Sequence, residues 1–80
     1  MERDLSIVGA IGVLTVGTRG VGGPGEVLLK VRGGSEAYLA WSDRSLPRGT
    51  KVLVVETRGA RVLEVVPWSE SPMPFGESLE

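Results

Sequence analysis

The chain shows its clearest pattern near its end, where two runs of β-branched residues flank a short turn. Residues 49–67 read GTKVLVVETRGARVLEVVP, with the turn at 58–60 and Pro67 closing the second run. This pattern predicts a β-hairpin with strands over 51–57 and 61–66. Strand formers occupy both faces of these runs: Val52, Val54, Val55, Val62, Leu63, Val65 and Val66. We therefore expect the hairpin to lie inside a curled sheet, with a closed small barrel as the leading fold.

A long first strand is predicted over residues 5–16, an apolar run interrupted by Gly9 and Gly12. Glycines inside a strand commonly mark a bulge or a sharp bend. Such a bend allows one strand to serve both halves of a small barrel.

Two more strands follow, over 26–32 and 35–41. The first alternates, with Val27, Leu29 and Val31 on one face, which is typical of a half-buried strand. Gly33-Gly34 predicts a primed hairpin turn between the two strands. On the later strand one face carries Ala37, Leu39 and Trp41.

The remaining segments are predicted to be loops and ends. Residues 17–25 carry five glycines and one proline, a composition typical of a flexible loop. Residues 42–50 connect two strands, and we expect Leu46 to plug one end of the barrel. A short helical turn is compatible with this connection, but Pro47 and Gly49 exclude a full helix.

The pattern predicts an all-β chain with one five-stranded OB-fold-like barrel, and an SH3-like barrel is the chief rival. The expected division is a flexible N-terminus over 1–4, the barrel over 5–68 and a disordered tail over 69–80, with Trp68 packing back on the barrel. The final Leu79-Glu80 matches the dipeptide that a common cloning site leaves before an affinity tag. A natural ending in Leu-Glu and a domain cut from a longer protein both stay open.

The amino-acid composition excludes several kinds of functional site. The 80 residues contain neither cysteine nor histidine, so thiolate metal sites are excluded and most metal and acid-base chemistry lacks its usual side chains. We expect no cofactor, no metal and no small-molecule substrate. The formal net charge of −1 and the pI near 5.4 argue against the broad positive field that non-specific nucleic-acid binding generally needs. No apolar run approaches the roughly 18 to 20 residues that span a bilayer, so we expect the chain itself to be soluble.

One face remains a candidate for binding single-stranded nucleic acid. It consists of Lys30, Arg32, Tyr38 and Trp41, an aromatic and basic set of the type that such barrels use. Strict alternation, however, places Tyr38 and Trp41 on opposite sides of their strand. The favoured interpretation has one aromatic side chain in or at the rim of the core and the other partly exposed.

Three groups of residues could suggest catalysis or phosphate binding, and each has a commoner structural interpretation. The glycines at 17–25 lack both the Gly-Lys-Ser/Thr ending and the following helix that phosphate loops require. Ser42 and Ser45 with Lys51 have no nucleophile-elbow spacing and lie in a polar connection. Glu56 and Glu64 are expected on the two arms of the hairpin, where ion pairing at a solvated edge is the commoner use. The sequence therefore predicts a protein that is not an enzyme.

Taken together, residues 7–67 resemble the C-terminal OB-fold domain of the NfeD family. The matching features are Val8-Gly9-x-x-Gly12-Val13 with Thr15, then Gly25-Glu26-Val27, Tyr38-Leu39-Ala40, Gly49-Thr50-Lys51-Val52-x-Val54-Val55 and Leu63-x-Val65-x-Pro67. The glycine-rich stretch at 17–25 is longer than is usual in the family, and Trp41-Ser42-Asp43 matches only loosely.

The resemblance implies a non-catalytic protein-interaction module, the soluble part of a multi-helix membrane protein that works beside stomatin- or flotillin-like membrane-organising proteins. It also implies a domain on the cytoplasmic face, with its partner surface on barrel loops or exposed strand edges. The serine protease domain of longer relatives has no counterpart in these residues. A single-stranded nucleic-acid binder is the alternative.

Overall fold

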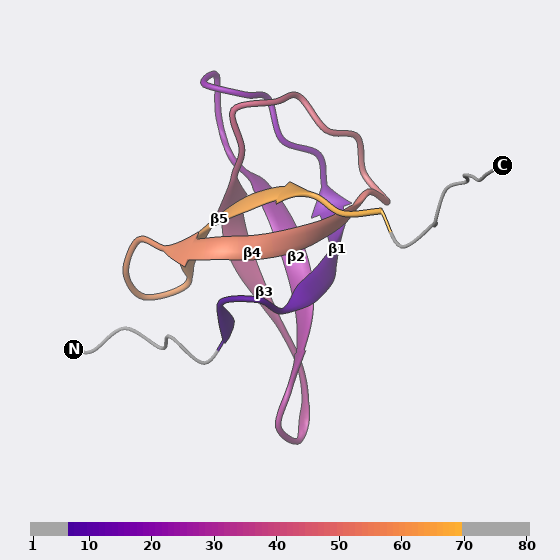
Figure 1. Ribbon diagram of the computed structural model, residues 1–80, viewed down its shortest axis with the longest axis vertical. Helices are drawn as coiled ribbons and strands as arrows, with labels where there is room; N and C mark the ends of the chain where they lie inside the picture. Colours follow the sequence, from indigo (N-terminus) through magenta and orange to yellow (C-terminus); the bar gives the residue numbers. More distant parts are fainter. Residues whose placement is uncertain (1–6, 70–80) are drawn as a thin grey trace, which may run out of the picture.

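The computed structural model describes residues 7–69 and places five strands in a closed barrel (Figure 1). The strands are β1 (Ile11–Val16), β2 (Gly25–Val31), β3 (Gly34–Trp41), β4 (Lys51–Thr57) and β5 (Val62–Pro67). Their order around the barrel is β1-β2-β3-β5-β4, and β4 pairs with β1 to close it. Neighbours are antiparallel except β3 and β5, which are parallel. The predicted five-stranded, OB-type all-β barrel is confirmed. The predicted ends, 1–4 and most of 69–80, lie outside the described residues.

The core is built from the inward-facing positions of each strand. Along β2, Val27 and Leu29 are buried and Val31 is half-buried, as the alternation predicts. On the hairpin of β4 and β5 the buried side chains are Val52, Val54, Leu63 and Val65.

The outer face of that hairpin is open, which corrects the expectation that both of its faces lie inside the sheet. Val55 and Val66 are exposed, and Val62 is half-buried. A barrel of five strands has one interior, and within 7–69 no second layer of strands or helices packs over its outside.

The first strand is shorter than predicted. It begins at Ile11, because the chain turns through 7–10 with Gly9 at a φ of 97°. The bulge lies between Leu14 and Val16 and not at a glycine. Gly12 instead permits close approach of β2: a Cβ there would lie 2.7 Å from the Leu28 carbonyl oxygen. β1 nevertheless pairs with both β2 and β4, as expected of a strand that serves both halves of the barrel.

Both predicted hairpins are present with small shifts. In the last hairpin, β4 occupies residues 51–57, as predicted. The turn that follows is four residues long, 58–61, so β5 begins at Val62, one residue later than predicted. The other turn is formed by Arg32 and Gly33, one residue earlier than predicted. Only its second position, Gly33, has a positive φ, of 86°. That is the pattern of a type II turn, so the predicted primed turn is wrong.

The loop 17–24 and the connection 42–50 are joined at one end of the barrel, at the top of Figure 1. The buried Thr18 hydroxyl donates to the Arg44 carbonyl at 2.6 Å and accepts from the Leu46 amide at 2.9 Å. Leu46 is buried, which confirms the predicted plug, and the connection forms no helix. The glycine-rich loop is thus anchored at Thr18 by hydrogen bonds that its composition does not predict.

Candidate interaction surfaces

The four residues predicted as a binding face are divided between two hollows. Lys30, Arg32 and Tyr38 line a hollow of about 470 Å³, which we call the basic hollow, together with Ile7, Ala10, Val31 and Glu36. Trp41 lines a separate hollow of about 390 Å³ with Gly20, Val21, Ser42, Asp43, Arg58, Glu64 and Val66. Alternation along β3 explains the separation, because Tyr38 packs against the core and Trp41 points to the opposite face. The structure therefore brings together three of the four residues.

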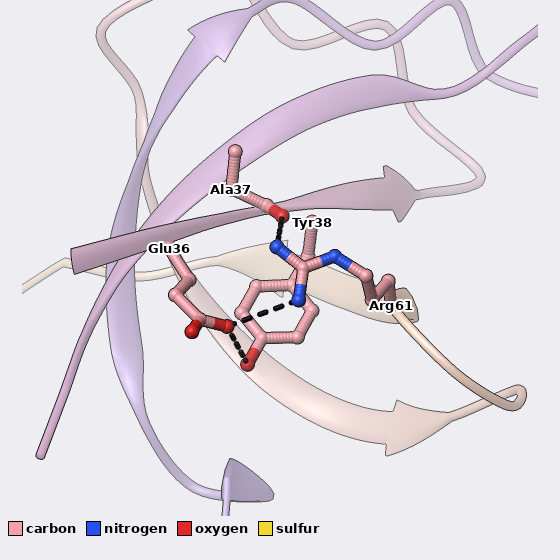
Figure 2. A network of polar contacts seen from close by, with 4 residues as sticks. All are labelled: Glu36, Ala37, Tyr38 and Arg61. Atoms are coloured by element: carbon pink, nitrogen blue, oxygen red, sulfur yellow. Dashed lines mark hydrogen bonds and ion pairs between the residues drawn. The ribbon is translucent and has the colours of Figure 1, made fainter.

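Arg61 lies over the ring of Tyr38, one of the residues that line the basic hollow (Figure 2). Its guanidinium carbon lies 5.1 Å from the centre of the Tyr38 ring, within the range of a cation–π contact. The same group donates to Glu36 Oε1 at 3.0 Å and to the Ala37 carbonyl at 3.1 Å. The charge of Glu36 is thus offset by Arg61, and the Arg61 guanidinium covers one face of the Tyr38 ring.

The position of Arg61 follows from the way that β3 and β5 meet. Their parallel pairing is short, from Leu39↔Val62 to Trp41↔Glu64, so the start of β3 extends past β5. Arg61 immediately precedes β5, and its side chain donates to the carbonyl of Ala37, in the part of β3 that has no partner on the β5 side. It adopts a left-handed conformation with a φ of 62°, which is uncommon for a non-glycine residue. The sequence gives no local sign of this contact, since 24 residues separate the two partners.

Trp41 has a similar neighbour in the other hollow. The Arg58 guanidinium carbon lies 5.5 Å from its ring centre, and Arg58 also forms an ion pair with Glu64. Glu64 faces Glu56 across β4 and β5, as predicted from the hairpin. The Arg58 charge offsets the repulsion that two facing carboxylates would otherwise produce.

A row of apolar side chains covers the outside of the barrel across its strands, and the sequence interpretation did not single it out. Register places Val13 beside Leu28, and Ile11 beside Leu53, which in turn lies beside Val66. We call this set the outer band, and its members are Ile11, Val13, Leu28, Leu53 and Val66. All are exposed except Leu53, which is half-buried. Strand alternation contained a sign of the outer band, since its members are apolar residues at outward positions of their strands.

Comparison with known proteins decides the family. A model of the NfeD C-terminal domain matches residues 11–66, a range that contains all but the last residue of the barrel strands. The chain belongs to the NfeD family. A solved relative is the soluble domain of the NfeD protein YuaF from Bacillus subtilis, determined in solution. It has 33% sequence identity, a TM-score of 0.66, and an alignment covering 78% of this chain and 74% of that one. Curated proteins gave no match.

The two serine hydroxyls of the connection 42–50 in this NfeD domain have structural partners. Ser42 Oγ accepts from the Arg44 amide at 3.2 Å, and Ser45 Oγ donates to the Thr18 carbonyl at 3.3 Å. Both bonds hold the connection 42–50 in place, as is common for serines in turns. Across 7–69 no three or more Asp or Glu side chains gather as they would around a metal ion. The same residues include no helix long and apolar enough to cross a bilayer.

Proposed function

We propose that this NfeD domain is a non-catalytic interaction module whose outer band docks onto a protein partner of the stomatin or flotillin type. In this proposal the parent protein is anchored in a membrane and presents the barrel on the cytoplasmic face. The outer band is the observation that carries the proposal. Single exposed apolar residues are common on protein surfaces, whereas a contiguous set marks an interaction site.

The geometry favours the barrel wall over the strand edges as the docking surface. Closure gives each of the five strands a neighbour on both sides, so that free edge is limited to stretches that extend past a neighbouring strand, among them parts of β2 and β3. The Val13 and Leu28 side chains, 40% and 42% exposed, lie side by side near the middle of the wall. Covering them would remove apolar surface from water without rearranging the barrel.

The binding test uses the 80-residue chain and purified soluble segments of a stomatin-type and a flotillin-type protein. Binding of the wild-type chain to either segment is measured by biolayer interferometry. Val13→Lys and Leu28→Lys should each weaken it by about tenfold or more, because a partner would have to desolvate the added ammonium group. Both side chains point outward, so the variants should keep the wild-type circular dichroism spectrum.

Ala60→Lys is the matched control, since it adds the same charge at an exposed position in the 58–61 turn, outside the outer band. Its affinity should equal that of the wild type. A wild-type chain that binds neither segment contradicts the proposed partner. Band variants that bind as tightly as the wild type contradict the proposed surface.

The membrane orientation has its own test in the parent protein. Protease added to intact cells should leave the barrel uncleaved, and permeabilisation should expose it. Cleavage in intact cells would place the domain on the other face.

A further inference from the structure

The basic hollow has a charge opposite to that of the whole chain. Lys30 and Arg32 form no ion pair within the described range, while Glu36, the one acidic residue among the described residues that line the hollow, is paired with Arg61. Among residues 7–69 these two cations therefore have no neutralising partner, although the formal net charge of the whole chain is −1. A ligand that enters this hollow is selected for negative charge.

The floor of the same hollow is apolar. Ile7 is buried, and Ala10, Val31 and Tyr38 are half-buried against the core. An apolar side chain that packs against this floor removes apolar surface from water, which favours binding. A purely ionic ligand would leave the floor exposed to water. The combination fits a ligand with carboxylates next to an apolar group.

Two features disfavour a nucleic-acid strand at this place. Stacking of bases needs free aromatic faces, and Arg61 already lies over one face of Tyr38. The second aromatic residue, Trp41, lines the other hollow and cannot extend a stacking platform from Tyr38. What remains is two cations, Lys30 and Arg32, that line the same hollow as the apolar floor.

We propose that the basic hollow binds an acidic segment of a protein partner, in which carboxylates on both sides of one large apolar side chain reach Lys30 and Arg32. This inference rests on the proposed function, because it names the chemistry that a partner of the module would offer. Arg61 acts as a positioning residue: it neutralises Glu36, which would otherwise repel the incoming carboxylates.

The test measures fluorescence anisotropy of a labelled, amidated peptide Gly-Glu-Glu-Leu-Glu-Glu-Gly with the 80-residue chain at low salt. Lys30→Glu and Arg32→Glu should each lower the affinity by roughly tenfold or more, since each removes a charge-assisted contact and adds repulsion. Replacing the leucine of the peptide by serine should also weaken binding, because the floor loses its apolar partner. Arg61→Gln should weaken binding as well, and Glu36→Gln in that background should restore it. Such rescue would not follow from a merely structural role of Arg61.

Arg48→Glu is the control, an equal change of charge at an exposed position of the connection 42–50 that does not line the hollow. It should bind the acidic peptide like the wild type. No binding of the peptide by the wild-type chain overturns the inference, as does equal loss in Arg48→Glu. Tighter binding of a short oligothymidylate than of the peptide, lost in Lys30→Glu, would replace the inferred partner with nucleic acid.

The outcomes separate this inference from the proposed function. If the stomatin- or flotillin-type segment binds through the outer band while the acidic peptide does not bind, only the inference about the basic hollow is wrong. If the peptide binds and neither segment does, the named partner is wrong and the hollow remains an acidic-peptide site.

Discussion

Single residues in this barrel differ in whether the fold satisfies their polar groups. Thr18 and Thr57 are both buried, with 3% and 4% of their surfaces exposed. Thr18 makes two hydrogen bonds through its hydroxyl, while the Thr57 hydroxyl has no partner. A buried hydroxyl without a hydrogen bond has lost its water and gained nothing in exchange. Thr57 is therefore the place where a residue opposes the stability of the fold.

We expect Thr57→Val to raise the free energy of unfolding by about 1 kcal/mol, because a methyl group of similar shape replaces the unpaired hydroxyl. Urea unfolding followed by circular dichroism measures the change. Val54→Thr is the control, since it places a hydroxyl at a buried, apolar position of the same strand and should lower stability. A loss of stability in Thr57→Val would show that the hydroxyl has a partner.

At the scale of elements, two loops far apart in the chain behave as one unit. Thr18 in the loop 17–24 bonds to Arg44 and Leu46 in the connection 42–50, and the Thr18 amide donates to the Leu46 carbonyl at 2.8 Å. Composition predicts a flexible loop because glycine and proline disfavour regular structure, but composition carries no information about partners 26 or 28 residues away.

Thr18→Val should lower the free energy of unfolding by about 2 kcal/mol, since it leaves the buried Leu46 amide and the Arg44 carbonyl without their partner. Thr18→Ser keeps the hydroxyl and should retain most of the stability. Amide hydrogen exchange at Leu46 should quicken in the valine variant and change little in the serine variant. Equal exchange in both would mean that the hydroxyl does not hold the two loops together.

At the scale of the whole molecule, closure depends on a short seam between β3 and β5. The seam joins residues 39–41 to 62–64, and it is the one parallel pairing among the described strands. It completes the ring around the buried side chains of β4 and β5, so disruption of the interior should unfold all five strands together. A domain of 80 residues has little stability in reserve.

Val54→Asp should therefore unfold the chain, because an unpaired carboxylate in a position 1% exposed costs several kcal/mol. The neighbouring Val55→Asp provides the control: Val55 is 39% exposed on the outer face, and the variant should stay folded. Circular dichroism and proton NMR dispersion distinguish the two states. A folded Val54→Asp chain would be incompatible with the inward position of Val54.

The sequence by itself determined the five strands, most of their boundaries to within one residue, and the inward face of β2. Alternation is a local property with a period of two, so Val27 and Leu29 could be assigned without knowing their neighbours in space. The family resemblance followed from the same residues. The structure matches the predicted binding face only in part. Lys30, Arg32 and Tyr38 line one hollow, whereas Trp41 lines another.

Only the tertiary structure decided how the strands meet. Closure paired β3 with β5, carried Arg61 to Glu36 and Tyr38, and aligned outward residues of β1, β2, β4 and β5 into the outer band. It also left the outer face of the last hairpin open. These features depend on contacts between distant residues, whose choice is set by packing and register across the whole barrel and not by the local pattern of any one strand.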